Sequence, residues 1–154
     1  MARLFIGIML PQNLKDDVVS LQNRVKRCAE GKFVEKENLH ISLSFLGEVG
    51  ENVFATVKTG LDEVCRKYSP AEIKLSKLKL IPSPKFLRVV ALDAESSNIA
   101  DLSREVKTKI GGEVKPPHLT LCRVRKSIDL EKLQRLKFDE IKFTPSSVSI
   151  VRSH

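Results

Sequence analysis

Two near-identical tetrapeptides, one in each half of the chain, constrain the fold more than any other feature of this sequence. They are His40-Ile41-Ser42-Leu43 and His118-Leu119-Thr120-Leu121. Each follows an apolar segment that an arginine opens, Arg3 or Arg88, and then a segment with helical spacing. The interval from arginine to histidine is 37 residues in the first half and 30 in the second. A diverged internal duplication explains this order of segments.

The hydrophobic pattern predicts the remaining elements, because alternation indicates strands and spacings of three and four indicate helices. The predicted strands cover residues 3–10, 38–47, 71–80, 87–94, 118–124, 141–143 and 148–151, and the predicted helices cover about 13–29, 52–68, 99–110 and 129–136. We expect Asn13 to cap the first helix and Gly31 to end it. Strand pairs mixed with helices favour an α+β fold with largely antiparallel sheets.

Size and charge limit the class of protein. The chain has 154 residues, of which 42% are hydrophobic, and this fits one compact domain over residues 1–154 made of two small lobes. Lysine and arginine number 27 against 19 acidic residues, giving a formal net charge of +8. This excess favours an anionic partner such as RNA, DNA, a phosphorylated metabolite or an acidic membrane face. A basic surface without a ligand would give the same numbers.

The cysteines and the first segment bear on localisation. The chain has three widely spaced cysteines, Cys28, Cys65 and Cys122. Because their number is odd and their spacing is wide, we expect buried free thiols in a reducing cytosol. The apolar run near the N-terminus is too short to cross a membrane and lacks the cleavage region of a signal peptide. We therefore expect a soluble, cytoplasmic protein without a membrane partner.

The repeated motifs predict a polar cleft. Period two places each histidine and the hydroxyl two residues later on the same strand face, about 7 Å apart along the chain. If the halves pack about a pseudo-twofold axis, the two faces oppose each other. They would then line a cleft with the side chains of His40, Ser42, His118 and Thr120. A lone histidine on a strand is usually structural, but two in matching motifs favour a functional site.

These groups suit a phosphodiester substrate. Imidazole titrates near neutral pH, so one ring can be neutral while its partner is protonated. The neutral ring can take a proton from an attacking water, and the charged ring can give one to the leaving oxygen. Ser42 and Thr120 can donate hydrogen bonds to the phosphate oxygens. A metal site is the alternative, but no Asp, Glu or Cys shares these strand faces, so we expect no metal and no cofactor.

Arg123 is a further candidate for phosphate binding. It lies five residues after His118, and odd and even positions of a regular strand face opposite ways. It therefore needs a bulge, a bend or the strand end to reach the cleft. There it would supply a forked cation for phosphate.

At these residues the chain resembles the 2H phosphoesterase superfamily. More closely it resembles the archaeal and bacterial RNA 2′,3′-cyclic phosphodiesterases, once called 2′–5′ RNA ligases. The likeness covers most of the chain, and its four blocks are more specific together than either tetrapeptide alone. The blocks are Arg3–Ile8, Glu37–Glu48, Phe86–Val90 and Pro117–Val124.

The resemblance implies a bilobal, duplicated fold with helices packed outside and the active site in a central cleft. It implies hydrolysis of RNA 2′,3′-cyclic phosphate ends to 2′-phosphomonoesters without a metal. His40 would be the general acid that protonates the departing 3′ oxygen, and His118 the general base that activates water. Ser42, Thr120 and Arg123 would hold the phosphate. Ser42 stands where threonine is commoner, but it keeps the hydroxyl.

Two further sets of residues carry expectations about RNA. Phe45 matches an aromatic position that packs near the substrate base in relatives. Strand parity instead predicts that its side chain faces the core with Leu43. The sequence leaves both orientations open. Basic residues near the motif strands are expected to gather RNA through phosphate contacts. They are Lys32, Lys36, Lys85, Arg88 and Lys126.

The expected partners are RNA with 2′,3′-cyclic phosphate ends or small cyclic nucleotides, bound by a monomer. Reverse ligation through a 2′–5′ bond is a variant of the same chemistry. The alternative from another class is a non-catalytic RNA-end-binding protein of the same fold. Relatives usually continue beyond the position of Val151 through a Gly/Pro turn and another strand. Without that strand we expect one sheet to lose an edge member and the cleft to be less enclosed.

Overall fold

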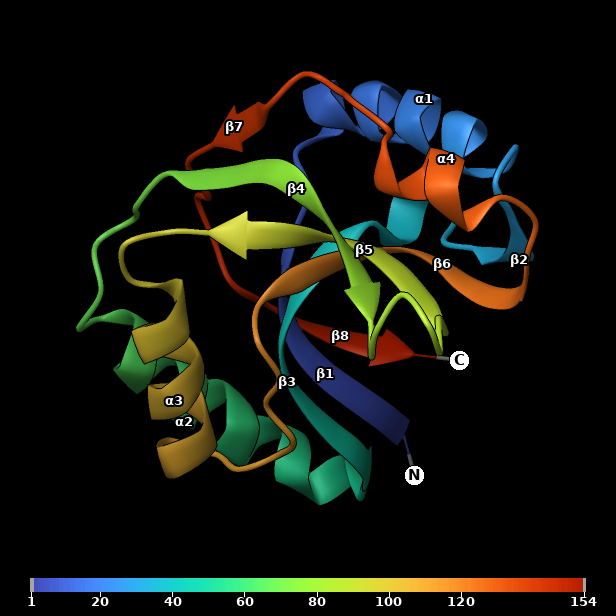
Figure 1. Ribbon diagram of the computed structural model, residues 1–154. Helices are drawn as coiled ribbons and strands as arrows, with labels where there is room; N and C mark the ends of the chain where they lie inside the picture. Colours follow the sequence, from blue (N-terminus) through green and yellow to red (C-terminus); the bar gives the residue numbers. More distant parts are fainter. Residues whose placement is uncertain (1, 154) are drawn as a thin grey trace.

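The computed structural model describes residues 2–153, which fold into one curled antiparallel sheet with helices packed against it (Figure 1). The strands are β1 (Ala2–Met9), β2 (Ala29–Phe33), β3 (His40–Val49), β4 (Ile73–Ile81), β5 (Val89–Glu95), β6 (His118–Ser127), β7 (Ile141–Phe143) and β8 (Ser149–Ser153). The helices are α1 (Lys15–Val25), α2 (Phe54–Cys65), α3 (Ile99–Lys109) and α4 (Leu130–Gln134). The strand order is β7-β4-β5-β6-β3-β1-β8, with β2 paired to β6. The predicted α+β class is confirmed.

The two motif strands, β3 and β6, are neighbours in the middle of this sheet. In each half the opening strand pairs with the motif strand that follows it, β1 with β3 and β5 with β6. The two motif strands then pair with each other at one position, Ile41 opposite Leu119. An antiparallel pair has a local twofold axis, so this contact lies at the centre of the pseudo-symmetry. The antiparallel sheets that the sequence predicted are thus parts of one continuous sheet.

The helices bury the apolar stripes that the sequence predicted. α2 and α3 contact each other and cover one end of the sheet, while α1 and α4 lie toward the other end (Figure 1). Their buried side chains recur at spacings of three and four. They are Val18, Leu21 and Val25 in α1, Val57, Leu61 and Val64 in α2, Ile99, Leu102 and Val106 in α3, and Leu133 in α4. These residues join the strand interiors in one hydrophobic core.

The prediction for the first helix is wrong at both ends. Asn13 lies inside a 3-10 turn, Gln12–Leu14, and does not cap α1, which begins at Lys15. The helix ends at Val25, and the segment around Gly31 is the strand β2. A Cβ added at Gly31 would overlap the Arg123 carbonyl oxygen. Gly31 is therefore needed for close approach to β6, and the short strand lacks the alternation that would reveal it.

The structure also bears on several smaller expectations. Cys28 and Cys122 are buried free thiols as predicted, whereas Cys65 is half-buried. Burial raises the pKa of the Cys122 thiol to about 11. No helix in the range 2–153 is long and apolar enough to cross a membrane. His154 and any strand that would follow it lie outside the described residues.

Candidate active site

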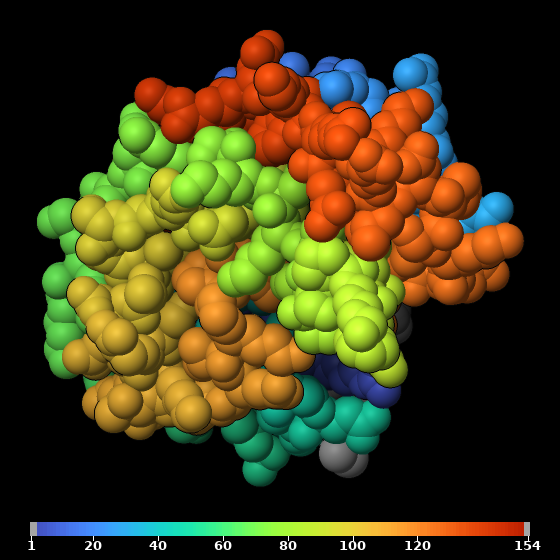
Figure 2. Space-filling model, viewed as in Figure 1, coloured from blue at the N-terminus to red at the C-terminus, as the bar shows by residue number. Residues whose placement is uncertain are grey.

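One open cleft receives side chains from both halves of the duplication. It has a volume of about 800 Å³ and lies between β1, β3 and β6 on one side and the β4–β5 hairpin on the other. In Figure 2 the yellow-green hairpin overhangs blue and teal atoms of the first half. The structure brings all six predicted site residues together in this cleft. They are His40, Ser42, Phe45, His118, Thr120 and Arg123.

A β-bulge in β3 determines which side chains reach the cleft. Gly7 of β1 pairs with Ser42, and the next pair along the ladder joins Ile6 to Ser44. Leu43 is therefore an extra residue without an opposite partner. Both Leu43 and Ser44 are buried, so two consecutive side chains turn inward.

The second motif strand repeats the bulge at the equivalent position. Ala91 of β5 pairs with Thr120, and the next pair joins Val90 to Cys122. Leu121 is the extra residue, and both it and Cys122 are fully buried. The two halves thus share a backbone irregularity as well as a sequence motif.

Each bulge reverses strand parity for the residues beyond it. The fifth residue after each motif histidine, Phe45 or Arg123, then faces the cleft and not the core. The parity prediction that Phe45 packs inside with Leu43 is wrong, because Phe45 is 43% exposed. Arg123 reaches the cleft by the bulge, one of the three routes that the sequence left open.

Hydrogen bonds on the far side of β3 hold its bulge in place. The Phe45 N–H donates to the Glu113 carbonyl at 2.9 Å, and the Glu113 N–H donates back at 2.8 Å. The Ser44 hydroxyl donates to the Gly111 carbonyl at 2.8 Å. The segment that follows α3 therefore takes up the polar groups that the bulge turns inward.

Backbone carbonyls fix the tautomer of both histidines. His40 Nδ1 lies 2.5 Å from the Asn38 carbonyl oxygen, and His118 Nδ1 lies 2.7 Å from that of Pro116. A carbonyl can only accept, so each Nδ1 carries a proton. Each Nε2 is then the nitrogen that can gain or lose a proton. In the neutral His40 ring, Nε2 accepts from the Ser42 hydroxyl at 2.9 Å.

Two residues of the opening strand position His40, and sequence reasoning missed both. The Phe5 ring stacks on the imidazole with centroids 4.4 Å apart and planes 27° from parallel. A Cβ added at Gly7 would lie 3.4 Å from His40 Cδ2 and 2.8 Å from the Ile41 carbonyl oxygen. Both residues fall within a run of large apolar residues that reads as ordinary core, so no pattern marks them.

The surroundings of His40 favour its neutral form. Burial lowers the pKa of His40 below its usual 6.5, the hydrogen bond to the Asn38 carbonyl raises this pKa, and the charge of His118 lowers it again. A positive charge on His118 therefore disfavours the protonated form of His40.

The cleft is cationic. Five basic side chains line it, and no acidic one does. Lys79 lies 3.9 Å from Asp93 and Lys115 lies 3.7 Å from Glu113. The other three basic residues, Arg3, Arg88 and Arg123, form no ion pair within residues 2–153. Sequence reasoning missed Arg3, Lys79 and Lys115 as cleft residues, because no motif marks them and they come from three separate segments of the chain.

The basic residues expected to gather RNA are distributed differently. Arg88 lines the cleft, but Lys32, Lys36, Lys85 and Lys126 do not. Lys36 instead lies 2.6 Å from the Asp16 carboxylate. Lys36 is therefore a poorer candidate for a phosphate contact with RNA, because its ammonium group already pairs with Asp16.

Neither the cleft nor its surroundings resembles a metal centre. Within residues 2–153, no group of three or more His, Cys, Asp or Glu side chains is placed to hold a metal ion. A cleft with two histidines and five cations but no carboxylate repels divalent ions. The donor set therefore does not fit a catalytic metal.

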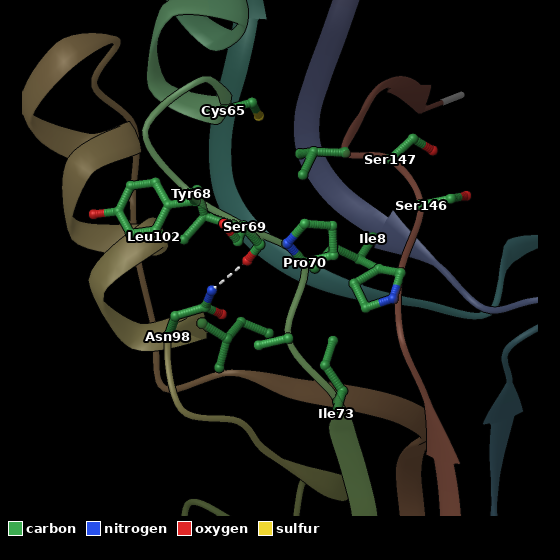
Figure 3. A pocket seen from close by; sticks show the side chains of 14 residues that line it. Ile8, Cys65, Tyr68, Ser69, Pro70, Ile73, Asn98, Leu102, Ser146 and Ser147 are labelled. Carbon is green, nitrogen blue, oxygen red and sulfur yellow. Dashed lines mark hydrogen bonds between the residues drawn. The ribbon is translucent and has the colours of Figure 1, made fainter.

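A second pocket, of about 210 Å³, contains none of the predicted site residues. It lies between the end of α2 and the start of α3 (Figure 3). Ile8 and Ile73 lie among its lining residues, and the Asn98 amide donates to the Ser69 carbonyl at 2.8 Å across one side. It has no charged side chain in its lining, and burial raises the pKa of its two titratable groups, the Cys65 thiol and the Tyr68 phenol.

Comparison with known proteins shows the family. Residues 8–91 match the family model described as LigT like Phosphoesterase, a range that includes His40 and ends before His118. Two proteins named RNA 2′,3′-cyclic phosphodiesterase are each 34% identical to the chain. The one from Methanothermobacter thermautotrophicus matches 87% of this chain and 77% of its own length, and the one from Methanocaldococcus jannaschii matches 91% and 81%. The chain belongs to the LigT-like phosphoesterase family.

Solved structures share the fold. A crystal structure of a Thermus thermophilus protein aligns over 99% of this chain and 88% of its own, with a TM-score of 0.81 and 21% identity. Escherichia coli LigT in complex with 3′-AMP aligns over the same shares, with a TM-score of 0.73 and 20% identity. At these identities the likeness concerns the fold alone.

The lowered pKa of His40 predicts how stability depends on pH. Between the folded and unfolded pKa values the unfolded chain binds more protons at this ring, so stability rises with pH there. The contribution is present above pH 6.5 and is lost as pH falls through the lowered pKa. We expect His40→Gln to lose less unfolding free energy than the parent protein between about pH 7.5 and about pH 5. Urea denaturation at both pH values measures this difference.

The same point can be checked directly. An NMR titration of the His40 ring in the free protein should give a pKa below 6.5. Phe5→Leu, which uncovers one face of the ring, should move this pKa upward. A value at or above 6.5 in the parent protein would contradict the assigned environment.

Proposed function

We propose that this protein hydrolyses 2′,3′-cyclic phosphate ends of RNA to 2′-phosphomonoesters, using His40 and His118 and no metal. The observation that carries the proposal is the pair of imidazoles in one acid-free cationic cleft. Each ring has its Nδ1 proton fixed by a backbone carbonyl and its Nε2 left to exchange a proton. The names of the M. thermautotrophicus and M. jannaschii relatives support the same activity.

The two rings divide the proton transfers. Nε2 of His118 takes a proton from water as the water oxygen attacks phosphorus. The bond from phosphorus to the 3′ oxygen breaks, and Nε2 of His40 gives its proton to that oxygen. The product keeps its phosphate on the 2′ oxygen.

Substrate binding prepares His40 for its role as the acid. In the free cleft, burial and the charge of His118 hold the pKa of His40 down. A bound phosphate carries the opposite charge and so favours the protonated ring. Binding of the phosphate therefore favours the protonated form of His40, which then donates its proton to the substrate.

The register of the motif strands arranges the phosphate ligands. Because Ile41 pairs with Leu119, each motif hydroxyl lies across from the histidine of the other half. Ser42 and Thr120 can then donate to phosphate oxygens from the two sides of the pseudo-twofold axis. Arg123 supplies a forked cation, which stabilises the charge that develops on these oxygens.

The terminal base fits the aromatic side of the cleft. Phe45 is exposed there, and its ring centroid lies 6.0 Å from that of Phe5, which stacks on His40. A base placed on Phe45 would lie beside the phosphate site. The complex of the E. coli neighbour with 3′-AMP supports a nucleotide as the kind of ligand.

Two related activities are less well supported. Ligation through a 2′–5′ bond is the reverse reaction and uses the same residues, but bulk water favours hydrolysis. A non-catalytic RNA-end-binding protein would not require two rings that are oriented by backbone carbonyls at Nδ1 and turn Nε2 toward the cleft. Complete survival of a cyclic nucleotide during long incubation, together with salt-sensitive binding, would favour that alternative.

Removal of either ring tests the proposal. We expect His40→Ala and His118→Ala each to lower kcat on a 2′,3′-cyclic mononucleotide by about 10²- to 10⁴-fold. Excess EDTA should leave the parent activity unchanged. Far-UV circular dichroism and thermal denaturation of both variants control for misfolding. Turnover that EDTA abolishes and zinc restores would refute the metal-independent mechanism.

Arg123 offers a matched test of the bulge in β6. Arg123→Ala should lower kcat/KM for a cyclic mononucleotide by about ten- to a hundredfold, because a charged hydrogen bond to phosphate is lost. Arg125→Ala removes the same side chain two residues further along β6, where it does not line the cleft. It should leave kcat/KM within about twofold. Equal losses in the two variants would mean that the effect reflects general surface charge.

A further inference from the structure

A second groove lies beside the cleft, and we call it the hairpin groove. It is formed by the turn between β4 and β5 and by the segment that joins β6 to α4. Its lining residues are Pro84, Lys85, Phe86, Leu87, Arg88, Ser127, Ile128 and Leu130. Arg88 lines both the hairpin groove and the cleft, so the two surfaces adjoin at this residue.

The hairpin groove exposes apolar side chains that most surfaces would cover. Phe86 is 66% exposed and Ile128 is 53% exposed, more than the other large hydrophobic side chains within residues 2–153. Phe86 and Ile128 line the same groove, and an exposed apolar patch with polar residues around it commonly marks a binding surface. In Figure 2 the yellow-green hairpin stands at the surface beside orange atoms of the C-terminal half.

The turn that carries Phe86 is ordered by hydrogen bonds. The Phe86 N–H donates to the Ser83 carbonyl at 3.2 Å, with the Ser83 hydroxyl 3.3 Å away. The Arg88 N–H donates to the Ile81 carbonyl at 2.8 Å, which closes the turn. Phe86 is therefore presented to solvent by a defined backbone, and a ligand would not have to order the loop first.

The charge of the hairpin groove complements a polyanion. Lys85 and Arg88 are its charged lining residues, and neither has an acidic partner within residues 2–153. Lys85 Nζ lies 5.8 Å from the centroid of the Phe86 ring, so the cation and the aromatic ring are next to each other. This combination of aromatic face and unpaired cations binds single-stranded nucleic acid through stacking and phosphate contacts.

We propose that the hairpin groove binds the RNA strand on the 5′ side of the terminal nucleotide, with a base stacked on Phe86. This inference rests on the proposed function, which places the cyclic phosphate in the cleft. Arg88 then contacts a phosphate where the strand passes from the cleft to the groove, and Lys85 contacts one further along. The preferred substrate is therefore an oligonucleotide and not a cyclic mononucleotide.

A comparison of substrates tests this subsite. Phe86→Ala should lower kcat/KM for an RNA trinucleotide with a 2′,3′-cyclic phosphate end by about tenfold, the effect of one lost stacking contact. It should leave kcat/KM for a cyclic mononucleotide within about twofold. Phe86→Trp should restore the trinucleotide value. Phe54→Ala serves as the control, because Phe54 is 42% exposed but lies at the start of α2 and lines neither groove nor cleft.

The outcomes separate this inference from the proposed function. Equal effects of Phe86→Ala on both substrates would overturn the subsite while leaving hydrolysis intact. If the parent protein hydrolyses neither substrate, binding of a fluorescent trinucleotide with a 2′-phosphate end still tests the groove. A severalfold weaker Kd in Phe86→Ala but not in Phe54→Ala supports the subsite, and equal Kd values overturn it. Self-association of the parent protein that Phe86→Ala abolishes would also overturn it, because the groove would then bind a second copy.

Discussion

The pairing of Ile41 with Leu119 is the point at which the two motif strands meet, and the arrangement of the cleft depends on it. It turns both apolar side chains into the core and leaves the motif polar groups on the opposite face. Burial of the two side chains stabilises the contact by roughly 1.5–3 kcal/mol each. The same interaction therefore stabilises the fold and sets where the two histidines stand relative to each other.

The bulge beside this pairing extends the polar face in both halves. Without it, a regular strand would send the fifth residue after each histidine into the core. With it, one half contributes an aromatic ring at Phe45 and the other a guanidinium at Arg123. The duplicated backbone thus keeps two equivalent imidazoles while the next cleft residue differs in chemistry. This difference gives a near-symmetric site an aromatic end and a cationic end, which suits a nucleotide with one base and one phosphate.

The sequence predicted those parts of the site that local periodicity controls. The motif faces of His40 and His118 follow from period two, and the internal repeat indicated that they converge. The sequence left undecided whether the Phe45 side chain faces the core or the cleft, because strand parity holds only where the pairing of β1 with β3 is regular. Phe5 and Gly7 could not be recognised, since stacking on His40 and close approach to it depend on the neighbouring strand. The strand around Gly31 was missed because its pairing with β6 is a long-range contact without a local pattern.

The regiochemistry of hydrolysis tests most directly whether two fixed imidazoles act on opposite sides of one phosphate. An RNA oligonucleotide with a 2′,3′-cyclic phosphate end is hydrolysed in ¹⁸O-labelled water, and the products are identified by ³¹P NMR. A single product with its phosphate on the 2′ oxygen and one ¹⁸O on phosphorus is predicted. A 3′-phosphate, or a mixture of both isomers, would contradict the account, because the leaving oxygen would not be set by the position of His40.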